Sequence, residues 1–124
     1  MRFTTEAFRA LVDQALDGLP EQFLPYLDGL AVDVEPMPDE ATLRSVGLAD
    51  PRSLLGLYHG TPLTERSVAH TVGWPERIVI YQRNVERICR TRRQIIHQVR
   101  RTVLHEIGHH FGLDERDLDE LGYG

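Results

Sequence analysis

Residues 105–115 read HEIGHHFGLDE, which contains the pattern HExxH followed by xxGxxE. Residues four apart on an α-helix are separated by only about 40° of rotation, so His105 and His109 would project from one face. Such a pair suits one zinc ion, and Glu106 lies beside it, where a carboxylate can reach a water without displacing a ligand. This stretch therefore predicts a helix that carries a metal site.

A third ligand is expected just beyond this helix. Gly112 can adopt a left-handed conformation and end the helix, so that the chain turns back sharply. Glu115 then returns as a candidate third ligand and leaves a fourth coordination position open, as a catalytic zinc site requires. Spacing favours Glu115. The acidic residues that compete with it for this position are Asp114, Asp117 and Asp119.

Zinc at such a site suits hydrolysis. It lowers the pKa of a water toward neutrality, and Glu106 could take the proton as the water attacks a polarised carbonyl. This chemistry hydrolyses peptide bonds. A surface helix could carry two histidines and a glutamate by coincidence, but the continuation through Gly112 and Glu115 favours metal binding.

The motif lies at the end of a longer helix, which we expect to run from about Thr91 to Phe111. One face of this helix is apolar at helical spacing and contains Ile96, Val99, Val103 and Ile107. At about 100° per residue, His105 and His109 point roughly opposite to that face. His110 falls near Val103 on the same wheel, so we expect it to pack on the core side or support the site rather than bind metal.

The segments before the motif predict another helix and a small sheet. Apolar residues recur at helical spacing from Phe8 to Leu19, with Thr4 or Thr5 as the cap and Gly18 as the stop. Three short stretches have the composition of β-strands, and they lie at 30–34, 54–58 and 78–81. A proline-marked loop spans 36–51, in which Asp39 could cap one helical turn.

The whole pattern predicts an α+β fold. Residues 114–121 can form a last short helix that carries Glu115. We expect residues 1–124 to form a single domain, in which a three- to four-stranded sheet packs against the N-terminal helix and the HExxH helix.

Composition argues against a secreted or membrane protein. The hydrophobic content of 41% and charged content of 27% are ordinary for a globular chain, and no stretch approaches the roughly 18 apolar residues of a membrane span. The single cysteine, Cys89, cannot form an internal disulfide and suggests a reducing compartment. Since residues 1–6 also lack a signal-peptide pattern, we expect a cytoplasmic protein.

Arginine is unevenly distributed along the chain. Between Arg77 and Arg101 there are eight arginines and one acid, Glu86. Such a run could attract nucleic acid, but no aromatic interleaving or known motif supports that role. A solvated face is favoured, and no nucleic-acid partner is expected. The pattern does not indicate an oligomeric state.

Other polar residues have weaker claims to function. His59, His70 and His97 lack ligand spacing and are expected at the surface or in packing, although His59 could line a cleft. Tyr81 and Tyr123 could each donate a hydrogen bond to an oxyanion, but packing or exposure is favoured for both.

At the motif, the sequence resembles the zincin superfamily of metallopeptidases, and more closely the small bacterial zincin-like family described as minimal metalloproteases. The string HEIGHHFGLDE matches that family's HExxHxxGxx(D/E) pattern, and the order of N-terminal helix, small sheet and motif helix agrees over nearly the whole chain. This resemblance implies that His105, His109 and Glu115 bind Zn²⁺ and that Glu106 is the general base.

Two hypotheses of function follow from these residues. The first is a zinc-dependent peptidase whose peptide or protein substrate lies in a shallow cleft and pairs its backbone with the sheet edge. The second is a metal-binding or protein-interaction module that has the zincin fold but no turnover. It is motivated by the missing methionine turn of metzincin-type relatives, which usually also carry histidine at the position of Glu115.

Overall fold

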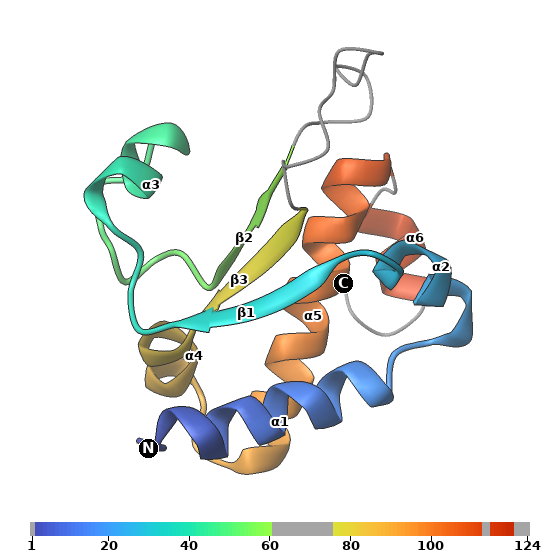
Figure 1. The fold of residues 1–124 in the computed structure, drawn as a ribbon, viewed down its shortest axis with the longest axis horizontal. Coiled ribbons are helices and arrows are strands. Elements are labelled where there is room, and N and C mark those ends of the chain that lie inside the picture. Colours follow the sequence, from blue (N-terminus) through green and yellow to red (C-terminus); the bar gives the residue numbers. More distant parts are fainter. Residues whose placement is uncertain (1, 61–75, 113–114, 121–124) are drawn as a thin grey trace.

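A computed structural model describes residues 2–60, 76–112 and 115–120. These residues form an α+β fold in which a small mixed sheet packs against helices (Figure 1). The strands are β1 (Ala31–Glu35), β2 (Gly56–His59) and β3 (Arg77–Tyr81), in the order β1-β3-β2. Strand β1 is parallel to β3, whereas β2 is antiparallel to it. The predicted fold class is thus confirmed.

Two long helices, α1 (Thr5–Asp17) and α5 (Arg92–Phe111), pack against each other, and α5 also packs on β2 and β3. Thr4 caps α1 and Thr91 caps α5, each through a side-chain oxygen that accepts a backbone N–H. Both helices bury one apolar face, as predicted. The core includes Phe8, Val12, Val32, Ile78, Ile80, Ile95, Val99, Val103, Leu104 and Ile107. No helix in the described part of the chain is long and apolar enough to cross a membrane.

Several short helices complete the described chain. They are η1 (Glu21–Phe23), α2 (Leu24–Leu27), α3 (Glu40–Ser45), α4 (Gln82–Ile88) and α6 (Glu115–Glu120). Asp39 caps α3 as predicted, because its carboxylate accepts the Thr42 N–H at 2.7 Å. Helix α6 also lies close to its predicted place.

Helix α4 was not predicted, because its buried face is mostly polar. Apolar periodicity is the main local indication of a helix. Here Val85 is buried together with Gln82, Asn84 and Glu86, so the apolar pattern is too sparse to indicate a helix. The helix also follows β3 directly, and Tyr81 provides no side-chain cap.

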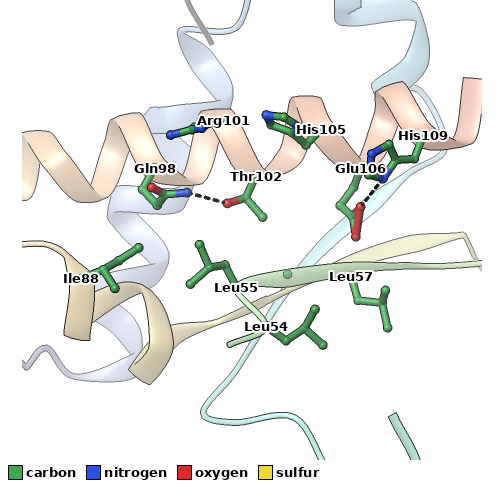
Figure 2. A pocket seen from close by; sticks show the side chains of 11 residues that line it. Leu54, Leu55, Leu57, Ile88, Gln98, Arg101, Thr102, His105, Glu106 and His109 are labelled. Atoms are coloured by element: carbon green, nitrogen blue, oxygen red, sulfur yellow. Dashed lines mark hydrogen bonds and ion pairs between the residues drawn. The ribbon is translucent and has the colours of Figure 1, made fainter. Parts of the chain in front are cut away.

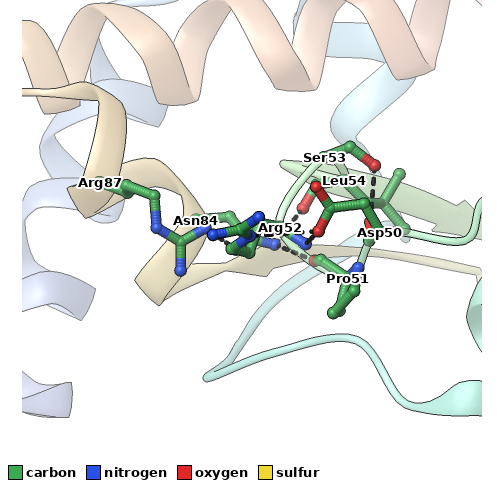
Figure 3. Close-up of polar contacts among 7 residues, drawn as sticks. All are labelled: Asp50, Pro51, Arg52, Ser53, Leu54, Asn84 and Arg87. Carbon is green, nitrogen blue, oxygen red and sulfur yellow. Dashed lines mark hydrogen bonds and ion pairs between the residues drawn. The ribbon is translucent and has the colours of Figure 1, made fainter.

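Strand β2 begins two residues later than predicted because its partner β3 ends at Tyr81, and Asn84 of α4 holds the backbone that precedes it. The Asn84 side-chain amide donates hydrogen bonds to the carbonyl oxygens of Pro51 and Leu54, at 2.8 and 2.7 Å (Figure 3). The backbone before Gly56 is therefore hydrogen-bonded to α4. Because Asn84 is fully buried, these two bonds also satisfy polar groups that would otherwise be costly to bury.

Gly56 allows α5 to approach the sheet closely, and we predict that Gly56→Ala destabilises the fold by about 2 kcal/mol. An added Cβ would lie 2.6 Å from the Thr102 methyl carbon and 3.0 Å from the Val79 carbonyl oxygen. Urea unfolding of purified protein measures this decrease in the free energy of unfolding. Thr102→Ser in the same chain removes the methyl and should restore part of the stability. Equal stability of Gly56→Ala and the parent protein would contradict the close packing.

Candidate functional site

A pocket of about 630 Å³ lies between α5 and the β2 region. His105, Glu106 and His109 all line it, so three of the four predicted site residues meet in one place (Figure 2). The opposite wall is formed by residues 54–57, which lead into and through β2. The site therefore depends on how α5 packs beside the edge strand.

Helix α5 contributes two parallel rows of side chains to this pocket. Residues four apart lie one above another on a helix. One row, nearer β2, consists of Gln98, Thr102 and Glu106. The other row consists of Arg101, His105 and His109. The predicted metal face is thus one row of a longer polar surface.

The two histidines of the second row have suitable chemistry for one metal ion. Their ring centroids lie 6.3 Å apart and the ring planes are inclined by 73°. The side chain of His109 is 70% exposed, whereas the Nε2 atom of His105 is shielded from solvent. Imidazole nitrogens beside a carboxylate are a donor set that suits zinc.

Glu106 is held against the edge strand. Its Oε1 atom accepts the backbone N–H of Tyr58 at 3.2 Å, and its Oε2 atom lies 3.6 Å from Nδ1 of His109. The side chain is only 15% exposed. Burial raises the pKa of Glu106, and the Tyr58 N–H and the two histidines offset only part of this rise. A carboxyl group with a raised pKa is a stronger proton acceptor.

The strand register explains why the Tyr58 N–H faces α5. Backbone groups of an antiparallel strand point alternately toward and away from the partner strand. Since the Tyr81 N–H donates to the Leu55 carbonyl at 2.9 Å, Leu55 and Leu57 direct their backbone groups toward β3. Gly56 and Tyr58 therefore direct theirs outward, to the side from which Glu106 approaches.

The C-terminal end of α5 has the predicted geometry. Gly112 is left-handed, with φ of 78°, and its N–H bonds the Gly108 carbonyl. Helix α6 then begins at Glu115. The side chains of Glu115 and Asp117, and the whole of Asp114, lie outside the description. Among the residues that are described, no group of three or more His, Cys, Asp or Glu side chains could hold a metal ion.

His110 lies on the side of α5 that faces β2. Its ring stacks on Tyr58, with the centroids 4.1 Å apart and the planes inclined by 16°. It does not line the pocket that contains His105 and His109. This agrees with the helical wheel, which places the adjacent histidines on different sides of α5.

Three of the remaining candidate residues, His59, Tyr81 and His97, do not line the pocket. His59 is half-buried at the end of β2, and burial, aided by Arg77, lowers the pKa of its imidazole. Tyr81 is buried in β3, and burial raises the pKa of its hydroxyl. His97 is exposed on α5. His70 and Tyr123 lie outside the described residues.

Comparison with known proteins identifies the family. The zincin-like metallopeptidase family matches residues 27–124. The chain belongs to this family. The resemblance inferred from the motif is therefore confirmed, and proteins of this zincin-like family typically bind zinc. A search of curated proteins finds no match to this zincin-like chain.

Several residues of the pocket lie outside the site predicted from the sequence. Gln98, Thr102 and Arg101 continue the two rows of α5 toward its N-terminus. Their four-residue spacing from Glu106 and His105 was visible in the sequence and could have identified them. The contribution of Ile88 was not visible, because it depends on the unpredicted helix α4.

Proposed function

We propose that this zincin-like protein is a zinc-dependent peptidase. The observation that carries the proposal is the meeting of two imidazoles and a half-buried carboxylate in one pocket beside an edge strand. His105 and His109 would hold the zinc ion, and Glu115 would be the third ligand. The left-handed conformation of Gly112 supports this assignment, because it ends α5 three residues before Glu115.

The proposed chemistry divides between the metal and Glu106. Zinc, when bound, supplies a Lewis acid that polarises the peptide carbonyl and makes water a better nucleophile. Glu106 would accept the proton of the attacking water and then deliver it to the amine that leaves. The Tyr58 N–H orients this carboxylate, while burial favours its protonated form between the two transfers.

The edge of β2 is the proposed place for the substrate backbone. Gly56 and Leu57 line the same pocket as Glu106. The backbone groups of Gly56 and the Tyr58 carbonyl point outward from the sheet, whereas the Tyr58 N–H is already bonded to Glu106. An extended peptide that pairs with a strand edge is fixed in register by its backbone, without requirements on its side chains. This arrangement would hold a peptide bond next to Glu106.

The experiment that tests the proposal combines zinc titration with peptide cleavage. Purified metal-free protein is titrated with zinc by calorimetry, and the zinc-loaded protein is incubated with a peptide library analysed by mass spectrometry. The proposal predicts one bound zinc ion per chain and cleavage that a chelator stops. Zinc binding without cleavage supports the inactive module instead. A folded protein that does not bind zinc contradicts both.

We predict that Glu115→Gln weakens zinc binding more than any other single acid-to-amide change in the C-terminal segment. Loss of a charged ligand should lower the affinity at least about tenfold. Calorimetry on Asp114→Asn, Asp117→Asn and Asp119→Asn provides the matched comparison. If one of these three variants shows the larger loss, the third ligand is that aspartate rather than Glu115.

We also propose a cytoplasmic location for the enzyme. The only cysteine, Cys89, is buried and is not paired in a disulfide. A chain that contains a single buried thiol is compatible with a reducing compartment.

A further inference from the structure

The pocket extends beyond the proposed zinc site toward the N-terminal half of α5. Arg101 lies four residues before His105 in the same row of side chains, which is about 6 Å along the helix axis. It is exposed and lines the pocket wall (Figure 2). A cation therefore lies one helical turn from the residues proposed to carry out the chemistry.

Arg101 differs from Arg100 and Arg83, which both have partners within the described part of the chain. Arg100 donates hydrogen bonds to the carbonyls of Ala15 and Gln14, and Arg83 pairs with Glu86. Arg101 makes no hydrogen bond or ion pair with any residue that the structure describes. Of the described residues that line the pocket, only Glu106 is acidic, and its Oε1 atom is engaged by the Tyr58 N–H. The charge of Arg101 is thus available to a ligand.

The same end of the pocket is apolar. Leu54, Leu55 and Ile88 line it, and Ile88 is 56% exposed at the end of α4. The hydrogen bonds from buried Asn84 to Pro51 and Leu54 hold this wall in place. The polar groups of Gln98 and Thr102 bond each other at 3.2 Å on the opposite wall. An exposed isoleucine and an exposed guanidinium that line the same pocket suit a ligand with both apolar and anionic groups.

We propose that Arg101 is a specificity residue that binds a carboxylate of the substrate, while an adjacent large apolar side chain contacts Leu54, Leu55 and Ile88. The inference rests on the proposed peptidase function for the identity of the ligand as a peptide. A guanidinium binds a carboxylate through two parallel hydrogen bonds. An extended peptide advances about 3.4 Å per residue, so the carboxylate lies within about three residues of the cleaved bond. It belongs either to an Asp or Glu side chain or to the peptide C-terminus.

Binding of short fluorescent peptides to metal-free protein tests this recognition without requiring turnover. Fluorescence anisotropy compares a peptide containing Leu-Glu with otherwise identical Leu-Gln and Ser-Glu peptides. Each peptide is made with a free and an amidated C-terminus, which separates the two sources of carboxylate. A carboxylate that pairs with Arg101 should improve affinity about tenfold. Replacing Leu by Ser should also weaken binding, because it removes the apolar contact.

Two pairs of variants assign these preferences to the pocket. Arg101→Gln should abolish the preference for the carboxylate, whereas Arg93→Gln, an exposed arginine of α5 outside the pocket, should retain it. Ile88→Ser should reduce the preference for Leu. Leu24→Ser is the matched control, because Leu24 is 50% exposed and lies on α2. Circular dichroism and thermal unfolding check that each variant is folded.

The outcomes separate this inference from the peptidase proposal. A preference for the carboxylate that Arg101→Gln removes supports the recognition, whether or not the zinc-loaded protein cleaves the peptide. Cleavage without that preference leaves the peptidase proposal intact and overturns the role of Arg101. Equal affinity of the Glu, Gln and amidated peptides, or no binding by any of them, also overturns it.

Discussion

Glu106→Gln is expected to lower kcat for peptide cleavage by about 10²–10⁴-fold while zinc affinity stays close to that of the parent protein. The amide cannot accept the proton of the attacking water. It keeps the shape of the carboxylate, and its carbonyl oxygen can still accept the Tyr58 N–H that lies 3.2 Å from Oε1. The substitution should therefore remove a catalytic step without disturbing the pocket.

The measurement is the cleavage rate of one library-selected peptide, with zinc affinity determined by calorimetry on the same preparations. Glu40→Gln is the matched control, because Glu40 is an exposed carboxylate on α3 and should retain full activity. Activity that survives in Glu106→Gln rules out the proposed general base. A parallel loss of zinc binding would instead show that Glu106 is a ligand or supports one.

Glu86→Ala is expected to destabilise the folded protein by about 3 kcal/mol at neutral pH. Glu86 is 3% exposed and accepts three hydrogen bonds, from the Phe3 backbone N–H, the Gln82 amide and the Arg83 guanidinium, at 2.8, 3.0 and 2.7 Å. Removing the carboxylate leaves these donors in a site with little access to water. It also removes one of the hydrogen bonds between the segment before α1 and α4, although the Gln82 and Arg83 side chains still donate to the Phe3 carbonyl.

The contribution of Glu86 should depend on pH in a defined direction. Burial alone would raise the pKa of Glu86, but the hydrogen bonds from Gln82, Phe3 and Arg83 outweigh it and lower the pKa below its ordinary value of 4.5. A carboxyl group with a lowered pKa in the folded state stabilises the fold above its unfolded pKa. This stabilisation is lost as pH falls through the folded pKa. The difference between the parent protein and Glu86→Ala should therefore be largest near neutral pH and shrink below about pH 4.

Urea unfolding at a series of pH values measures this difference. Glu21→Ala is the control, because Glu21 is an exposed carboxylate and its removal should change stability little. If Glu86→Ala is as stable as the parent protein at pH 7, the buried network contributes no net stability. If the difference grows at low pH, the direction of the pKa shift is wrong.

The arginine-rich region from Arg77 to Arg101 shows what a charge pattern in the sequence can predict and what it cannot. Its sequence predicts a solvated face with one acid, Glu86. In the structure that acid is buried and neutralises Arg83, while Arg100 reaches across to α1. The partners of these arginines are set by tertiary contacts, since Arg100 and Ala15 are 85 residues apart in the chain. The charge pattern of this stretch therefore does not show which arginines pair within the fold and which, like Arg101, line the pocket.

The sequence by itself determined α5, a threonine cap at the start of α1, the left-handed end at Gly112 and the approximate positions of all three described strands. These features depend on periodicity, capping and backbone preference, which act between residues close in the chain. The separation of His105 and His109 from His110 follows from the same helical geometry.

Only the tertiary structure decided which residues surround the metal-binding face of α5. The Tyr58 N–H reaches Glu106 across 48 residues of sequence, and buried Asn84 holds a wall of the pocket through contacts 30 and 33 residues away. Such contacts join polar groups from different elements, and no local period encodes which of them are brought together. For that reason the sequence indicated the metal-binding face, whereas the pocket beside Arg101 became visible only after α4 and β2 were packed against α5.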